Sequence, residues 1–132
     1  MNKKDPPSME EWLREAKADP CAAQCGMFLV HNGVVRRSRR EQVRDGKEGL
    51  SPVTGMEFSC DVEKMEEAKR KALAMPGIFI VRVWLNEGRL EVGDDIMFVL
   101  VGGDIRPHVI DALQSLVAEL KTRCVTEKEI TE

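Results

Sequence analysis

Two apolar runs, IFIVRVWL at residues 78–85 and IMFVLVGG at residues 96–103, constrain the fold of this chain more than any other feature. Each has the length of a strand and is rich in the β-branched and aromatic residues that strands favour. In the first run the apolar residues do not alternate with polar ones, which predicts a strand covered on both faces for much of its length. A third run, GMFLVHNGVVR at residues 26–36, has a similar composition. The sequence therefore predicts a sheet built from these three strands.

Helical spacing is present in three segments. Residues 10–18 follow Ser8, and Glu11 lies three positions after it, which predicts a capping box at the start of a helix. Residues 62–75 place their apolar side chains on one face, and residues 109–120 form a wide apolar stripe. Strands with helices packed on one face of their sheet predict an α+β domain.

The chain of 132 residues is most simply a single domain. Residues 1–7 are polar and contain two prolines, so we predict a flexible tail there and one domain over residues 8–132. Residues 37–55 carry arginines and glycines without apolar periodicity, which predicts an arginine-rich loop that is mobile or functional. Asn32-Gly33 is open to two interpretations, a hairpin turn or a bulge in one continuous strand.

The composition excludes several classes of function. A formal net charge of −3 disfavours wholesale binding of nucleic acid or acidic membranes, although residues 36–47 carry six basic against two acidic side chains. Because no uncharged apolar run of about 18 residues is present and the N-terminus lacks the apolar core of a secretory signal, we expect a cytoplasmic protein. The sequence contains no phosphate loop, dinucleotide fingerprint, zinc-protease helix or serine elbow.

Four cysteines, at positions 21, 25, 60 and 124, do not have the spacing of a metal site. No second close pair and no histidine cluster completes a tetrahedral set of ligands. We expect four reduced, partly buried thiols and no bound metal. A catalytic cysteine is the alternative, but neither histidine is placed by sequence to act as its base.

The candidate site residues are mainly cationic. Lys121 falls on the flank of the last apolar stripe, where its stem can follow the core while its amine reaches a rim. Lys128 is nearly in phase with it if the helix continues, and this relation is lost if residues 124–126 are extended. Each lysine is either a solvated charge at a helix end or a group that stabilises an anion or moves a proton.

Two arginines and two histidines complete this set. Arg36 leaves a strand, and Arg106 lies between a strand end and a helix start, where free backbone donors and a guanidinium suit anions. His31 lies within an apolar strand, which favours a satisfied core or interface histidine over a base. His108 is interpreted as an ordinary residue of a first helical turn.

Taken in order, these segments resemble the large, catalytic subunit of molybdopterin synthase, the MoaE family. The strand GMFLVHNGVVR matches the family pattern G-x-x-x-x-x-x-G-x-V-R, which favours the bulge over the hairpin. Two further segments, MEFSCDVEKMEEAKRKAL and GRLEVGDDIMFVLV, match the helix and the apolar strand that follow in the family. The resemblance covers roughly residues 8–130 and implies an α+β domain of the α/β-hammerhead type, with helices packed on a mixed or antiparallel sheet.

The resemblance also implies roles for the cationic residues. Lys121 and Lys128 match the two lysines of the family and would be catalytic, through stabilisation of negative charge, proton transfer and substrate activation. Arg36, Arg106 and Arg37 would bind the phosphate and carboxylate groups of the substrates. We expect these groups to converge on one pocket wide enough for a slender peptide tail.

The implied activity is sulfur transfer in molybdenum cofactor biosynthesis. A small ubiquitin-like carrier (MoaD-like), ending in a Gly-Gly thiocarboxylate, would supply sulfur to cyclic pyranopterin monophosphate and so form the dithiolene of molybdopterin. A homodimer that binds two carriers as a heterotetramer is implied, with no cofactor, metal, nucleic acid or membrane. Ile105 stands where the family usually has a histidine, and residues 124–127 replace its proline and aromatic residues. A carrier-binding scaffold without catalysis, or an anion- or nucleic-acid-binding protein using the arginine loop, are the alternatives.

Overall fold

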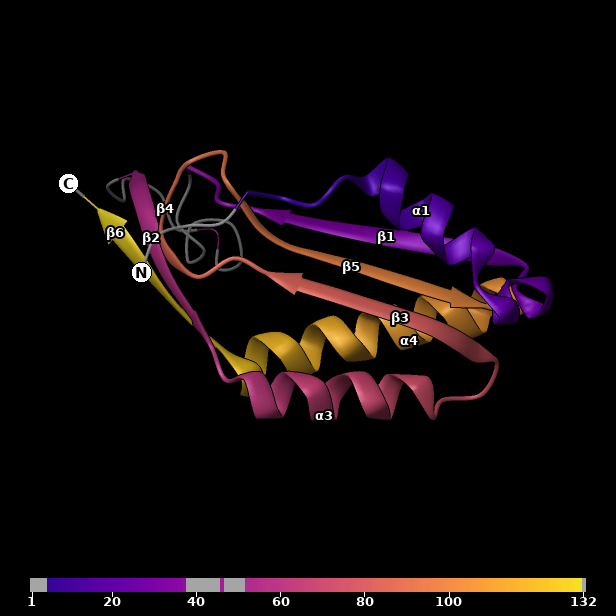
Figure 1. Cartoon of the computed structure of the whole chain (residues 1–132). Helices are drawn as coiled ribbons and strands as arrows, with labels where there is room; N and C mark the ends of the chain where they lie inside the picture. The colour runs from indigo at the N-terminus through magenta and orange to yellow at the C-terminus, as the bar shows by residue number, and fades with distance from the viewer. Residues whose placement is uncertain (1–4, 38–45, 47–51, 132) are drawn as a thin grey trace.

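The computed structural model describes residues 5–37, 46 and 52–131 (Figure 1). In chain order its elements are α1 (Met9–Ala18), a 3₁₀ turn η1 (Pro20–Gln24), β1 (Met27–Val34), β2 (Val53–Cys60), α3 (Val62–Leu73), β3 (Ile78–Leu85), β4 (Gly88–Glu91), β5 (Asp95–Gly103), α4 (Arg106–Glu119), a π-helical turn η2 (Leu120–Cys124) and β6 (Val125–Thr131). Residues 53–55, which we predicted to end the arginine loop, instead begin β2. The rest of that loop lies outside the described residues, except for Arg37, Gly46 and Pro52.

The three predicted strands form one antiparallel sheet in the order β1-β5-β3. The central strand, β5, is buried from Ile96 to Gly103, which explains why its apolar residues do not alternate with polar ones. The pairing of β1 with β5 shifts register between Gly33 and Val34. This shift confirms one continuous strand with a bulge, and not a hairpin at Asn32-Gly33.

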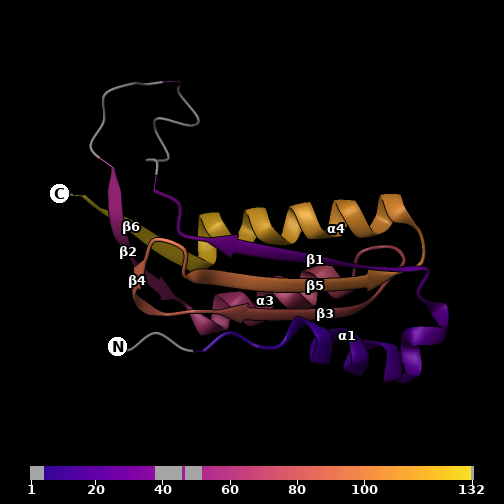
Figure 2. The same ribbon diagram turned by 90° about the horizontal axis from the view of Figure 1, so that it is seen from above.

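Helices cover both faces of this sheet, as Figure 2 shows from above. α3 and α4 lie on one face, where Val99 and Leu116 are part of the larger core. α1 lies on the other face, and its Trp12 packs edge-on against Phe98 at a ring-centroid distance of 6.5 Å. The prediction that all helices share one face is therefore wrong for α1, because β5 presents large apolar side chains on both of its faces. Within the described residues no helix is long and apolar enough to cross a membrane.

Only one of the two hydrogen bonds of the predicted capping box is present at the start of α1. The Ser8 hydroxyl accepts a hydrogen bond from the backbone N–H of Glu11 at 3.2 Å. The Glu11 carboxylate instead accepts a hydrogen bond from Arg14, one turn further along. The serine alone therefore caps the helix.

A second antiparallel sheet, in the order β4-β2-β6, lies at one end of the first. Its central strand, β2, pairs with β4 on one side and with β6 on the other. β6 is the short extended tail predicted from the sequence, whereas β2 was not predicted as a strand. The junction of the two sheets is the part of the molecule where the candidate site lies.

Candidate functional site

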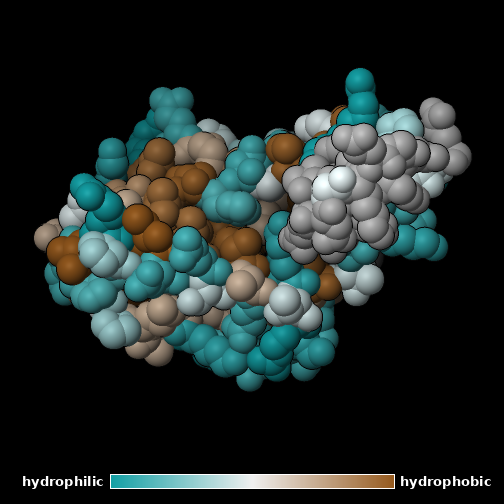
Figure 3. Space-filling view, turned by 180° about the vertical axis from the view of Figure 1, so that it is seen from behind, coloured by the Kyte–Doolittle hydropathy of each residue, from teal (hydrophilic) through white to brown (hydrophobic). Residues whose placement is uncertain are grey.

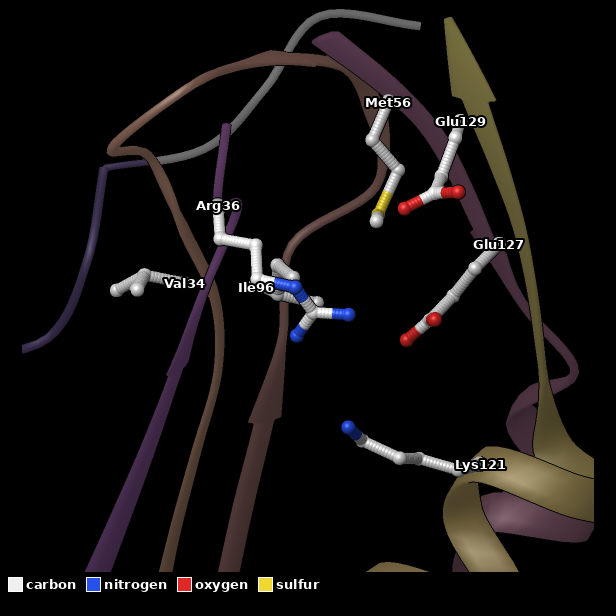
Figure 4. Close-up of a pocket in the computed structure, with 7 residues that line it drawn as sticks. All are labelled: Val34, Arg36, Met56, Ile96, Lys121, Glu127 and Glu129. Atoms are coloured by element: carbon white, nitrogen blue, oxygen red, sulfur yellow. The ribbon is translucent and has the colours of Figure 1, made fainter. Parts of the chain in front are cut away.

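A small pocket lies between the two sheets, at the C-terminal end of α4 (Figure 4). It is lined by Val34, Arg36, Met56, Ile96, Lys121, Glu127 and Glu129. Its volume is about 50 Å³, far below the roughly 300–1,000 Å³ of pockets that hold whole small molecules. The pocket itself therefore fits a narrow chemical group and not a ring system.

Lys121 reaches this pocket from the π-helical turn that follows α4. The flanking Leu120 and Cys124 are buried and fix the turn, and the N–H of Val125 donates to the carbonyl of Leu120. Thr122 donates its hydroxyl to the Ala118 carbonyl at 2.8 Å. Such turns are often found at functional sites. Here the turn leaves Lys121 exposed between two buried anchors, and its amine extends into the pocket.

Arg36 enters the pocket from the end of β1, just beyond the bulge. The preceding Val35 is buried, donates its N–H to the Asp94 carbonyl at 3.0 Å and accepts from the Gly93 N–H at 2.8 Å. With Val35 fixed inward, the alternation of extended backbone turns Val34 and Arg36 toward the pocket. Figure 4 shows the guanidinium of Arg36 and the amine of Lys121 directed into the same space. The predicted convergence of these two cations is therefore confirmed.

Two carboxylates on β6 share the pocket and were missed from the sequence. Because side chains on a strand alternate between its faces, Glu127 and Glu129 lie on one face and extend toward Arg36 and Lys121 (Figure 4). Two cations and two anions make the formal charge of the lining zero. An anionic ligand in this pocket thus competes with the protein's own carboxylates. The Glu-x-Glu spacing was the available signal, once residues 125–131 are recognised as a strand.

Lys128 lies outside this pocket, contrary to the predicted convergence. In β6 its side chain lies on the opposite face of the strand from that of Glu127, and the residue pairs directly with Glu57 of β2. It lines a second, open hollow of about 420 Å³, together with Glu57, Phe58, Ser59, Gly88, Arg89 and Thr126. The cause is the change of period at Val125: an extended chain repeats every two residues, so a lysine seven positions on is no longer in phase.

Arg106 and Arg37 do not line the pocket either. Arg106 is the first residue of α4, and the 14 residues of that helix span roughly 21 Å between it and the turn that carries Lys121. Arg37 accepts a hydrogen bond from the Val53 N–H on its carbonyl at 2.7 Å. The convergence of all the predicted cations within one chain is wrong for these two residues. Their roles in substrate binding stay predictions.

The two histidines differ from each other. The Nδ1 atom of His108 lies 2.8 Å from the Asp104 carboxylate, and this hydrogen bond is the main cause that lowers the pKa of Asp104. His31 was predicted to be satisfied, but its Nε2 is buried without a hydrogen-bond partner, the one such side-chain atom in the described part of the chain. Burial, and then the charge of Lys121, lower the pKa of His31. An unpaired buried group of this kind costs about 1–3 kcal/mol, so it needs an explanation.

The cysteines agree with the prediction of free thiols. Cys21, Cys25 and Cys60 are partly buried and Cys124 is buried, all unbonded. Burial is the main cause that raises the pKa of the Cys25 and Cys124 thiols, which keeps them protonated and unreactive. Across residues 5–37, 46 and 52–131, no group of three or more His, Cys, Asp or Glu side chains has the geometry to hold a metal ion.

The fold and the pocket define an α+β protein with a lysine and an arginine facing each other where two antiparallel sheets meet. A family model described as MoaE protein matches residues 3–123. The chain belongs to the MoaE family. No curated protein sequence matches it.

Solved structures share this fold at low sequence identity. A molybdopterin synthase from Staphylococcus aureus is 19% identical with a TM-score of 0.73, over 97% of this chain and 88% of that chain. Molybdopterin cofactor biosynthesis protein E from Burkholderia multivorans is 21% identical with a TM-score of 0.71, over 98% and 84%. A complex of subunits 1 and 2 of molybdopterin-converting factor from Helicobacter pylori is 18% identical with a TM-score of 0.65, over 96% of this chain and 80% of that chain. These likenesses confirm the predicted α+β fold, with helices packed on antiparallel sheets.

Proposed function

We propose that this chain is the cytoplasmic catalytic subunit of a molybdopterin synthase. It would transfer sulfur from the C-terminal thiocarboxylate of a small ubiquitin-like carrier to cyclic pyranopterin monophosphate. Membership of the MoaE family supports a place in molybdopterin biosynthesis. The observation that carries the site assignment is the convergence of Lys121 and Arg36 on one narrow pocket.

The size of the pocket favours the carrier's tail as its occupant. A C-terminal Gly-Gly has no side chains, so its thiocarboxylate is narrow enough for a cavity of about 50 Å³. The pterin precursor, which is far larger, would lie against the mouth of the pocket. Val34 and Arg36 are exposed and line the pocket, and a guanidinium suits the phosphate of the precursor.

Lys121 is suited to the chemical step. In each transfer, the sulfur of the thiocarboxylate forms a bond to a carbon of the precursor while a carbon–oxygen bond at that carbon breaks and its oxygen leaves as water or as a phosphate oxygen. Water then cleaves the resulting thioester, so that the sulfur stays on the precursor and the carrier is released as a carboxylate. Negative charge develops on oxygen in both steps. An ammonium held at that position stabilises the charge and supplies or takes a proton, which is the largest contribution that such a site can make.

The two glutamates favour one alternative function, a scaffold that binds the carrier without catalysis. Glu127 and Glu129 bring two negative charges to the place where the anionic tail would sit. An active enzyme must move these carboxylates or use them as proton acceptors, whereas a scaffold needs neither. Catalysis remains our proposal, because Lys121 and Arg36 keep the arrangement that the chemistry requires.

We further propose a homodimer. In the described part of the chain, the outer edge of β1 has no strand beside it. Figure 3 shows apolar side chains gathered on the face seen from behind, over β1 and α4. Half-buried apolar side chains on these two elements pack against the larger core: Met27 and Leu29 on β1, and Leu113 and Val117 on α4. Such an edge and such a patch favour association with a second copy.

The test is reconstitution from purified components. The protein is mixed with a thiocarboxylated carrier and cyclic pyranopterin monophosphate, and dithiolene is assayed. We expect conversion that depends on the thiocarboxylate. Carrier binding without conversion under any condition would favour the scaffold. Steeply salt-dependent binding of DNA or RNA without carrier binding would favour use of the arginine loop.

A further inference from the structure

Asn32 lies within β1, although strands disfavour asparagine. Its side-chain amide donates to two acceptors on the neighbouring strand β5, the Asp95 carboxylate at 3.1 Å and the Met97 carbonyl at 3.3 Å. The carbonyl of the adjacent Gly33 lies 3.4 Å from the same nitrogen. These partners indicate that the amide has a specific role in the pairing of β1 with β5.

The two acceptors on β5 lie on either side of the bulge. β1 advances by one residue from Gly33 to Val34, while the pairing partner on β5 changes by two positions, across Ile96. Ile96 is therefore the extra residue, and it belongs to the larger core like its neighbour Met97. On a regular strand these two neighbours would point to opposite faces, and the apolar Ile96 would stand opposite Val34 in place of Asp95.

The amide of Asn32 distinguishes the bulged register from the regular one. In the bulged register it meets a carboxylate, and hydrogen bonds to charged groups are among the stronger ones. In the regular register it would meet an isoleucine, whose side chain has no acceptor. On the other side of β5, the buried Asn86 donates its N–H to the Ile96 carbonyl at 2.9 Å and its amide to the Asp95 carbonyl at 3.0 Å. The start of β5 is thus held from both sides.

The bulge determines part of the lining of the pocket described above. Val34 and Ile96, which lie at the bulge, both line the pocket together with Arg36 (Figure 4). Next to Arg36, Val35 forms backbone hydrogen bonds of 2.8 and 3.0 Å with the turn at residues 93–94. In the regular register Ile96 would leave the lining, and the backbone bonds that hold Val35 would shift by one residue.

We propose that Asn32 is a positioning residue for this pocket. Its hydrogen bonds to Asp95 and Met97 stabilise the bulged register. That register keeps Ile96 in the lining and directs the guanidinium of Arg36 into the pocket. The effect on binding of the pterin precursor rests on the proposed function, whereas the effect on the register does not.

Hydrogen exchange, measured by NMR on the purified chain without carrier or precursor, tests the effect on the register. Asn32→Leu removes the amide and keeps the size of the side chain. We expect the Val35 and Gly93 amides to exchange about tenfold faster, and the Asp104 amide, which is hydrogen-bonded at the far end of β5, to be unchanged. Gln24→Leu, which replaces another exposed amide, is the control and should change none of them. Wild-type exchange at Val35 and Gly93 in Asn32→Leu would overturn the proposal.

An exchange of the two side chains tests the hydrogen bond between them. Asn32→Asp places two carboxylates against each other, so the Val35 amide should exchange faster than in Asn32→Leu. Adding Asp95→Asn restores one donor and one acceptor in the opposite order, and we expect most of the wild-type protection to return. If the double variant exchanges as fast as Asn32→Asp alone, the contact between these two residues does not stabilise the register and the proposal is wrong.

Binding of the pterin precursor distinguishes a positioning role from a purely structural one. We expect Asn32→Leu to weaken precursor binding about three- to tenfold, because Arg36 is held less well. In an Arg36→Ala background the same substitution should have no further effect, since the group that it positions is gone. An equal loss in both backgrounds would overturn the positioning role. If the wild-type chain does not bind the precursor, the proposed function is wrong, and hydrogen exchange still decides whether Asn32 stabilises the register.

Discussion

The polar side chains near the two ends of α4 differ in whether other protein groups form hydrogen bonds with them. At its N-terminal end, the Asp104 carboxylate binds both His108 and the N–H of Ile105, at 2.8 and 2.6 Å. The Asp104 N–H in turn donates to the Gly77 carbonyl at 2.9 Å. At the C-terminal end, Nε2 of His31 has no partner among the described residues, and the amine of Lys121 extends into a pocket.

This difference distinguishes polar groups that support the fold from polar groups that are kept for a ligand. A closed network satisfies its own members and fixes the connection between β5 and α4. Groups held without partners cost stability, and they persist where another constraint, such as binding, requires them. The comparison predicts that substitutions at one end change the stability of the chain, and that substitutions at the other end change its activity.

The largest expected effect is at Lys121. Lys121→Ala should lower the rate of dithiolene formation about 100- to 1,000-fold, because it removes the charge beside the developing oxyanion, and should leave the carrier bound. Single-turnover assays measure the rate, and titration calorimetry measures carrier binding. Lys128→Ala should have a smaller effect, since Lys128 lies on the other face of β6, and Lys17→Ala controls for the loss of an exposed lysine. An unchanged rate in Lys121→Ala would remove the lysine from the mechanism.

Arg36 should show the next largest effect. Arg36→Ala removes a charged donor from the lining of the pocket, so we expect binding of the pterin precursor to weaken about 10- to 100-fold. Arg37→Ala is the matched control, because Arg37 adjoins it in sequence and does not line the pocket. Equilibrium binding of the precursor to each variant measures the difference. An equal loss of precursor affinity in the two variants would mean that the two arginines attract the precursor by their general positive charge, and that the position of Arg36 in the pocket does not matter.

The closed end of α4 is tested at Gly77. This glycine has a φ of 76°, and a Cβ atom there would overlap the Asp104 carboxylate and Nδ1 of His108. Gly77→Ala should lower the free energy of unfolding by about 2–3 kcal/mol, from backbone strain plus disruption of the network. Gly93→Ala is the control, because Gly93 has a φ of 93° and nothing within 4 Å of its Cβ position. Urea denaturation measures the free energy of unfolding of both variants. An equal decrease in Gly77→Ala and Gly93→Ala would show that the network contributes no stability.

The smallest expected effect concerns the two glutamates. Replacing Glu127 and Glu129 together by Gln keeps the shape of the pocket lining and removes two negative charges. We expect the carrier's thiocarboxylate tail to bind about three- to tenfold more tightly, measured against a carrier that lacks its last two glycines. Tail binding that is weakened by this double substitution would mean that the carboxylates hold the tail or its partner groups in place.

Much of the fold could be predicted because strand and helix patterns are local properties of the sequence. The runs at 78–85 and 96–103 became β3 and β5, and the glycine at position 33 became a bulge. The face on which each helix packs could not be predicted, because it depends on how β5 divides its apolar side chains between α1 and α4.

Only part of the site could be predicted, and the reason lies at Val125. Arg36 and Lys121 end a strand and a helix that pack together, so their proximity follows from the fold. The positions of Lys128, Glu127 and Glu129 depend on the residue at which helix changes to strand. A shift of one residue at that point exchanges the two faces of β6. Sequence pattern locates such a boundary only to within a few residues.

The central claim is that the carrier's tail enters the pocket between Arg36 and Lys121. The most direct measurement is NMR of the complex with a carrier whose C-terminal glycine is isotopically labelled. We predict nuclear Overhauser contacts from that glycine to Val34, Arg36 and Lys121. Contacts to Phe58, Arg89 and Thr126 instead, in the hollow that Lys128 lines, would contradict the account.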